Sequence, residues 1–365
     1  MQRLMLVLGV VFALGACGGG QGNIDGGGAR ADAGDAGRAD AGRDGGAPDA
    51  GAPDGGPPPR AALQFVALGD TGEGNAAQRE VAQAILQTCT AEGGCDFAIL
   101  LGDNIYNAGV ESVTDSQWQT KFEEPYRDLD FPFYAVLGNH DYGGTLFGLD
   151  QGGLGNEWDR GPIEVAYTDV SAKWTMPDTF YTFRYGNVGF VVLDTNSMLW
   201  GNTDNGDQRT WFQPAVDALR AEGAEWILLA GHHTYRSNGA HGDAGSYESL
   251  EIAGVQVPNP LPILNGNNVR SFFDEVVCGQ VDVYLCGHDH NRQWIDEPGA
   301  LCGAELIVSG AGSKTKDFDS SANDVHWADA DTEGFLFVRI EGDTFYGRFV
   351  NRDGSTAFER MLGRR

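Results

Sequence analysis

The sequence is short of positive charge. Its 365 residues include 24 Lys and Arg against 52 Asp and Glu, which gives a formal net charge of −28. A surface this acidic repels nucleic acid and anionic membranes, so we expect neither as a direct partner. The charge does not exclude a small phosphorylated substrate, because bound metal ions reverse the local field around such a site.

Long apolar runs are also missing. The run Leu4–Leu14 is too short to cross a bilayer as a mature helix and fits the core of a signal peptide. It ends in Leu14-Gly15-Ala16-Cys17, which resembles a bacterial lipobox. We therefore interpret residues 1–17 as a lipoprotein-type signal peptide with lipid on Cys17, and an ordinary secretory signal is the alternative. The expected location is the cell envelope, periplasmic or at the cell surface, or the medium if the chain is secreted, with membrane contact only through the lipid anchor.

The next segment lacks large apolar side chains. Residues 18–60 are almost entirely Gly, Ala, Asp, Pro and Arg, with Ile24 as the one large aliphatic residue. Such a segment cannot bury enough apolar area to offset its chain entropy, so we expect a disordered linker. Residues 61–365 then form the folded domain, which we expect to be monomeric.

Cysteine is scarce, with six residues in the chain. If Cys17 carries lipid, five remain, so at least one thiol is free. Cys89 and Cys95 lie close enough in sequence for a short disulfide loop, and Cys278 with Cys302 is a second candidate pair. The sequence alone leaves the connectivity open. Cys286 falls inside an apolar run and is interpreted as a packed free thiol.

Five apolar runs each end in Gly followed by Asp, Asn or His. Such runs of four to eight residues are typical of buried strands, and ligands bind where the strands of open α/β sheets end. Only seven histidines are present, and most of them fall within or just after these loops. The five loops are Gly69-Asp70, Gly102-Asp103-Asn104-Ile105-Tyr106, Gly138-Asn139-His140-Asp141, Gly231-His232-His233 and Gly287-His288-Asp289-His290.

These motifs resemble the metallophosphoesterase superfamily, and the Tyr three residues after Asp103 resembles the purple acid phosphatases. The chain is similar to their small, tartrate-resistant branch over roughly residues 63 to 350. The resemblance implies an α/β fold with four layers, α/β-β/α, built around two mixed β-sheets. It also implies a dinuclear metal centre.

Carried onto matching positions, the resemblance implies metal-binding roles for seven of these residues. It assigns the first ion to Asp70, Tyr106 and His290, with Asp103 bridging the two ions. The second ion is assigned to Asn139, His232 and His288. A phenolate and carboxylates favour Fe(III), whereas imidazoles and an amide oxygen suit Fe(II), Zn or Mn.

The implied reaction is hydrolysis of phosphate monoesters by a metal-bound hydroxide, an acid phosphatase activity. His140 and His241 resemble the histidines that protonate the leaving group, and Asp141 is expected to orient His140. The alternative is a metallophosphodiesterase acting on nucleotide or phospholipid diesters. The third hypothesis is a non-catalytic surface lipoprotein that binds phosphate or metal.

The remaining expectations concern secondary structure and isolated residues. Residues 142–177 and the stretch after His232 depart from the family pattern, and 142–177 is expected to be a long loop or insertion near the active site. Lys314 and Lys316 are interpreted as a solvated turn, with contact to the substrate as the alternative, and His233 and His326 as packing or surface histidines. Helices are expected near 76–88, 115–128, 208–221 and 269–278, with hairpins over 180–193 and 335–350.

Overall fold

The computed structural model describes residues 62–146, 149–150, 152–204, 206–247, 250–252, 255–257 and 265–364. The predicted signal peptide with Cys17 and the predicted linker lie outside the described residues. Within the described part, no helix is long and apolar enough to cross a membrane.

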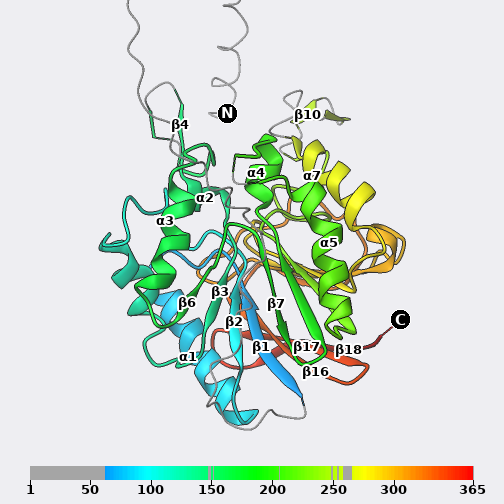
Figure 1. Ribbon diagram of the computed structural model, residues 1–365, viewed down its shortest axis with the longest axis horizontal. Helices are drawn as coiled ribbons and strands as arrows, with labels where there is room; N and C mark the ends of the chain where they lie inside the picture. Colours follow the sequence, from blue (N-terminus) through cyan, green and yellow to red (C-terminus); the bar gives the residue numbers. More distant parts are fainter. Residues whose placement is uncertain are drawn as a thin grey trace, which may run out of the picture. The chain divides into compact units, whose positions relative to one another are not determined.

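The described chain forms two seven-stranded mixed sheets that pack face to face (Figure 1). Strands β1, β2, β3 and β6 of the first sheet are parallel, and so are β8, β9, β12 and β14 of the second. The order of the first sheet is β18 (Thr356–Gly363), β17 (Thr344–Asn351), β16 (Gly334–Glu341), β1 (Leu63–Leu68), β2 (Phe97–Leu100), β3 (Phe133–Ala135) and β6 (Trp174–Thr175). The order of the second is β15 (Val325–Asp329), β13 (Arg292–Ile295), β14 (Glu305–Ser309), β12 (Val283–Cys286), β9 (Trp226–Ala230), β8 (Val188–Val192) and β7 (Tyr181–Tyr185).

Aromatic side chains fill the space between the two sheets. Phe65 of β1 and Phe97 of β2 stack at 5.0 Å, and the ring of Phe190 of β8 meets both edge-on. Tyr134 of β3 stacks on Phe183 of β7 at 3.8 Å between ring centroids. Because β1, β2, β3 and β8 are buried on both faces, their sequences read as largely apolar runs, whereas the edge strand β7 alternates.

Helices cover the outer faces and complete the four layers (Figure 1). Helix α1 (Ala76–Ala91) contacts the first sheet, and α5 (Gln208–Ala221) contacts the second. Asn75 caps α1 by accepting from the Gln78 N–H, and Val81 and Ile85, four residues apart on one face of the helix, are buried. The other helices in the described residues are α2 (Asn139–Tyr142), α3 (Arg160–Ala166), α4 (Thr195–Trp200) and α7 (Asn267–Phe272), with short π or 3₁₀ turns η1 (Gln119–Glu123), η2 (Tyr167–Asp169), η3 (Phe273–Val277) and η4 (Ala300–Gly303).

Two predictions of local structure were only partly right. Residues 115–128 are helical only over 117–123, where residues 117–118 lead into the π-helical turn η1. Asp115 Oδ1 accepts the Gln117 N–H at 2.9 Å in the manner of an N-cap, and Pro125, which lacks an N–H, does not continue the helix. The segment 142–177 is not a bare loop. It holds α3, η2, the edge strand β6 and a small hairpin of β4 (Thr145–Leu146) and β5 (Leu149–Asp150).

The structure joins Cys89 to Cys95 and Cys278 to Cys302, each pair with Cα atoms 5.2 Å apart. Cys286 on β12 is buried and free. A second small hairpin, β10 (Leu250–Ile252) with β11 (Val255–Val257), lies in the segment after His241.

Candidate metal centre

The predicted ligands meet where the central strands of both sheets end. The first sheet supplies Asp70 after β1, Asp103 after β2 and Asn139 at the start of α2, which follows β3. The second sheet supplies His232 after β9, and His288 and His290 after β12. Parallel neighbours bring their carboxyl ends to one edge, so residues far apart in sequence become neighbours in space.

One group of donors converges around the phenol of Tyr106. Its oxygen lies 2.9 Å from Asp70 Oδ1, 2.8 Å from Asp103 Oδ2 and 3.2 Å from His290 Nε2. His290 Nε2 is also 3.3 Å from Asp70 Oδ1. Asp70, Asp103 and His290 each offer one ligand atom within 4.8 Å of the others. Two buried carboxylates, an imidazole and a phenol at these distances form a donor set that fits a hard cation.

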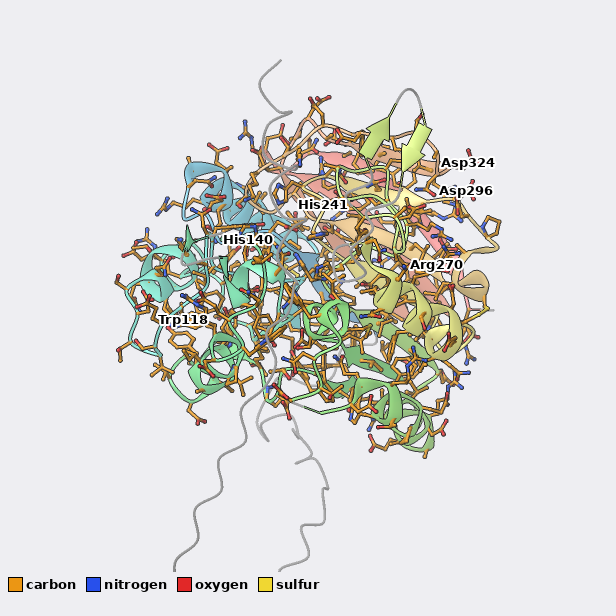
Figure 2. All side chains as sticks on the ribbon, turned by 90° about the horizontal axis from the view of Figure 1, so that it is seen from above. Trp118, His140, His241, Arg270, Asp296 and Asp324 are labelled. Atoms are coloured by element: carbon orange, nitrogen blue, oxygen red, sulfur yellow. A yellow bond between two sulfur atoms is a disulfide. The ribbon has the colours of Figure 1, made fainter. Side chains whose placement is uncertain are left out.

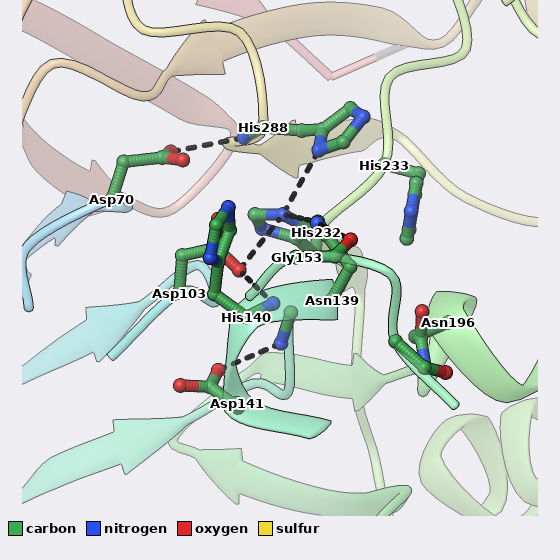
Figure 3. Close-up of polar contacts among 12 residues, drawn as sticks. Asp70, Asp103, Asn139, His140, Asp141, Gly153, Asn196, His232, His233 and His288 are labelled. Carbon is green, nitrogen blue, oxygen red and sulfur yellow. Dashed lines mark hydrogen bonds and ion pairs between the residues drawn. The ribbon is translucent and has the colours of Figure 1, made fainter. Parts of the chain in front are cut away.

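A second group converges around His232. Its Nε2 lies 3.0 Å from Asn139 Oδ1, 3.1 Å from His288 Nδ1 and 3.4 Å from Asp103 Oδ1 (Figure 3). His232 Nδ1 lies 2.8 Å from the Leu101 carbonyl, which fixes the ring and leaves Nε2 as the ligand atom. Asp103 therefore reaches the Tyr106 group with one oxygen and the His232 group with the other.

The backbone around these donors is held in a rare conformation. Asp70, Asp103 and His288 have φ of 59°, 55° and 70°, a region that residues with side chains seldom adopt. Backbone hydrogen bonds also fix the two carboxylates. The His288 N–H donates to Asp70 Oδ2 at 2.9 Å, and the His140 N–H donates to Asp103 Oδ1 at 2.9 Å. The site is thus preformed.

Glycine is required where the loops cross. A Cβ at Gly102 would lie 2.5 Å from His232 Nδ1, and one at Gly138 would lie 2.2 Å from Asp103 Oδ1. These close approaches explain why Gly precedes Asp103 and Asn139 in the sequence.

The electrostatics of the donor groups favour a bound cation. Burial, and then the carboxylates of Asp103 and Asp70, raise the pKa of Tyr106 well above its usual value. Burial alone would raise the pKa of Asp103, but the charges of His232 and His140 hold it below its usual value. A cation between these groups would offset the repulsion and favour the phenolate form of Tyr106.

Asp141 does not orient the His140 ring, so that prediction was wrong. Its carboxylate instead accepts the backbone N–H of Gly138 at 2.8 Å, of Asn104 at 2.7 Å and of Ile105 at 3.0 Å. It therefore ties the loop carrying Asp103 to the loop carrying Asn139. Burial and the charge of Asp103 raise the pKa of Asp141 to about 7.

His140 lies beside the Tyr106 group and His241 beside the His232 group, and Figure 2 shows both histidines near the middle of the view from above. The His140 ring is 4.5 Å from the Tyr106 ring, and its Nδ1 is 2.7 Å from the Asn107 carbonyl. The His241 ring is 4.0 Å from the His288 ring. A pocket of about 440 Å³ opens beside His241, and no Lys or Arg is among its lining residues: Ser237, Gly239, Ala240, His241, Gly242, Asp243, Ser246, Asp319, Ser320, Ala322 and Asn323.

The other two histidines do not join the donor groups. His233 is buried with Nδ1 2.9 Å from Thr195 Oγ1, and burial lowers its pKa well below the usual value. His326 lies 3.2 Å from Asp296 at the surface.

The sequence reasoning missed two contacts at the site. Lys314 does not lie in a solvated turn: its Nζ is 3.2 Å from the centroid of the Tyr106 ring. The carbonyl of Gly153 accepts from Asn139 Nδ2 at 2.6 Å. Both come from loops without periodicity, where the sequence offers no signal of which neighbour a residue will meet.

Comparison with known proteins agrees with the fold described above and identifies the family. The family model described as calcineurin-like phosphoesterase matches residues 63–292. Tartrate-resistant acid phosphatase type 5 of Rattus norvegicus is 28% identical over 341 residues, which span 84% of this chain and 92% of that protein. Purple acid phosphatase 4 of Arabidopsis thaliana is 26% identical and covers 70% of each chain.

Two solved structures share the fold. The purple acid phosphatase PPD1 of yellow lupin seeds has a TM-score of 0.58 at 17% identity, over 83% of this chain and 54% of that one. GAP50, the anchor in the inner membrane complex of Plasmodium, has a TM-score of 0.58 at 20% identity, over 84% and 90%. With the family model matched over most of the chain, this protein belongs to the calcineurin-like phosphoesterase family.

Proposed function

We propose that this protein is a metal-dependent phosphatase that hydrolyses phosphate monoesters at a dinuclear centre of Fe(III) with Fe(II), Zn or Mn. The observation that carries the proposal is the geometry of Asp103. Its two oxygens reach two separate donor groups, one of which contains the phenol of Tyr106 at 2.8 Å. A shared carboxylate between two donor groups suits a pair of cations, which need an anion between them.

When bound, the two ions supply a nucleophile from water and stabilise charge on the phosphoryl oxygens. The side chains of the protein would hold the two ions and supply a proton to the leaving group. Asp70, Tyr106 and His290 would hold one ion, and the other would be held by the donors that surround His232: Asn139, His232 and His288. His140 and His241 flank the donor groups, from where either can give a proton to the leaving alkoxide.

The comparison with relatives in sequence supports this activity more strongly than the comparison with solved structures does. Relatives named tartrate-resistant acid phosphatase match nearly their whole length, which favours a monoesterase. Fold alone does not assign catalysis, since the same fold serves as a phosphatase in lupin and as an anchor in Plasmodium. The intact donor set favours the enzyme over a non-catalytic binding protein.

A diesterase is the second candidate. The pocket beside His241 has no basic side chain among its lining residues, which does not favour a polyanionic leaving group. Hydrolysis rates of a monoester and a diester carrying the same alcohol separate the two. Faster turnover of the diester would replace the monoesterase proposal.

The first experiment is the visible absorption spectrum of the purified protein beside Tyr106→Phe. A purple wild type whose band is lost in the variant would assign tyrosinate on Fe(III). Tyr126→Phe, which alters a buried tyrosine outside the donor groups, is the matched control. A colourless wild type that holds two metals per chain would exclude a tyrosinate–Fe(III) centre in the protein as isolated.

We also propose that the protein is an exported, monomeric lipoprotein that meets the membrane only through Cys17 and binds no nucleic acid. The support is the sequence of residues 1–17 and the net charge of −28. Mass spectrometry of the N-terminal peptide and light scattering of the purified protein test it. An unmodified Cys17 in the mature chain, or a dimer, would contradict the respective part.

A further inference from the structure

Lys314 occupies an unusual place for a lysine in so acidic a protein. Its Nζ lies 3.2 Å from the centroid of the Tyr106 ring, directly over the face of the proposed phenolate ligand. The same Nζ pairs with Glu73 Oε1 at 2.7 Å. The Lys314 side chain is only 27% exposed, so water screens its charge less than that of a surface lysine.

The loop that carries Lys314 is fixed to the metal centre. The Ser313 hydroxyl donates to the Asp70 carbonyl at 2.5 Å, and the Asn75 side chain donates to the Ser313 carbonyl at 2.8 Å. Two residues later, the Lys316 N–H donates to the His290 carbonyl at 2.8 Å. The loop is thus tied on both sides of Lys314 to residues of the same donor group as Tyr106.

A cation over the face of an aromatic ring is attracted by the electrons of that ring. The attraction grows when the phenol loses its proton and binds a metal, because the ring then carries negative charge. The positive charge also makes it harder to remove electrons from the phenolate and from an ion bound to it. Glu73, paired with the same ammonium, weakens both effects.

We propose that Lys314 is a positioning residue that acts through Tyr106 to set the electronic state of the first metal. Its ammonium raises the energy of charge transfer from tyrosinate to Fe(III). It also raises the reduction potential of that ion, and Glu73 opposes it. The inference rests on the proposed function, because it requires iron bound to Tyr106.

The test compares four variants of the full-length metal-loaded protein by absorption spectroscopy and redox titration. In Lys314→Met we expect the visible band at longer wavelength and a lower midpoint potential. The ferrous-to-ferric ratio at a fixed potential should fall on the order of tenfold. Glu73→Gln should shift both quantities in the opposite direction, and Lys314→Arg, which keeps the cation, should resemble the wild type. Lys316→Met removes the same charge two residues away and should leave both quantities unchanged.

The outcomes separate this inference from the function on which it depends. A purple wild type with no shift in Lys314→Met and Glu73→Gln overturns the role of Lys314 and leaves the phosphatase intact. Equal shifts in Lys314→Met and Lys316→Met would reduce the effect to net charge and also overturn it. A colourless wild type with two metals refutes the ferric assignment, and this inference with it. If Lys314→Met does not fold, Glu73→Gln tests the inference by itself. A visible band at shorter wavelength and a higher midpoint potential in Glu73→Gln would support the role of Lys314, and unchanged values would overturn it.

Discussion

Asn139 is held by a carbonyl from the segment that the sequence could not place. Its Nδ2 donates to the Gly153 carbonyl at 2.6 Å, which turns Oδ1 toward His232 Nε2 at 3.0 Å (Figure 3). The segment is anchored beside this contact, since Asn196 donates to the Gly155 carbonyl and Trp200 to the Leu154 carbonyl. Residues 152–155 therefore orient a proposed ligand of the second metal.

Replacing Gly153 with Ala should disturb the second metal more than the first. The added Cβ would lie 2.4 Å from His140 Nε2 and 2.8 Å from Asn139 Nδ2, so both side chains must move. We expect metal content to fall from two ions toward one, and kcat/KM to fall by about 10- to 100-fold. Gly299→Ala, where a Cβ meets nothing within 4 Å, is the control. Full metal content in Gly153→Ala would mean that the contact does not orient Asn139.

The proton donor can be identified by varying the leaving group. If His140 or His241 protonates the alkoxide, its Ala variant should lose about 10²- to 10⁴-fold on an alkyl phosphate. It should lose far less on p-nitrophenyl phosphate, whose leaving group needs no proton. His326→Ala, which changes a histidine paired with Asp296 far from the donors, should behave as wild type. Equal losses on both substrates would assign the residue to binding rather than to proton transfer.

A buried acid beneath the site should make stability depend on pH. Burial, and then the charge of Asp141, raise the pKa of Glu164 well above its usual value. The native state thus keeps a proton that the unfolded chain releases at lower pH. Stability is complete below the usual pKa and is lost as pH rises toward the native pKa, by up to about 1.4 kcal/mol per pH unit.

Glu164→Gln imitates the protonated acid and removes this loss. In metal-free protein, the melting temperature of Glu164→Gln should exceed that of the wild type by more at pH 8 than at pH 5. Glu124→Gln, at an exposed position, should show no such trend. A constant difference between wild type and Glu164→Gln would show that Glu164 titrates normally.

The two disulfides should differ in their contribution to stability. Cys278 and Cys302 are 24 residues apart, whereas Cys89 and Cys95 are six apart. In the chain-entropy model, the longer loop contributes about 3.5 kcal/mol and the shorter about 2.4 kcal/mol. Urea denaturation of the two double Ala variants measures both values. The reverse order would mean that native-state contacts outweigh loop entropy.

The sequence predicted the inner strands and the clustering of the site. Strands such as Trp226–Ala230 are apolar, short and closed by Gly, and helix 208–221 has the predicted bounds. Because the fold places the ends of these strands at one edge, motifs spread over some 220 residues of sequence could be grouped before their distances were known.

Other elements could not be predicted from the pattern of apolar residues, for physical reasons. Strand β13 contains the buried polar residues Arg292 and Gln293, so its sequence does not look like a strand. Strand β18 lies at the edge of its sheet and is largely exposed, so few apolar residues mark it. The contacts of Lys314 and Gly153 depend on where two loops pass in space, which no local pattern encodes.

Each proposed ion would draw ligands from both sheets. Asp70, Asp103 and Tyr106 follow strands of the first sheet, whereas His290 follows a strand of the second. The other group likewise joins Asn139 to His232 and His288. Metal loading would therefore act as a cross-link between the two halves of the sandwich, comparable in effect to a disulfide. Removing the metals should make both sheets less rigid at this edge. Backbone amides there should exchange hydrogen slowly in the metal-loaded protein and faster in the metal-free protein.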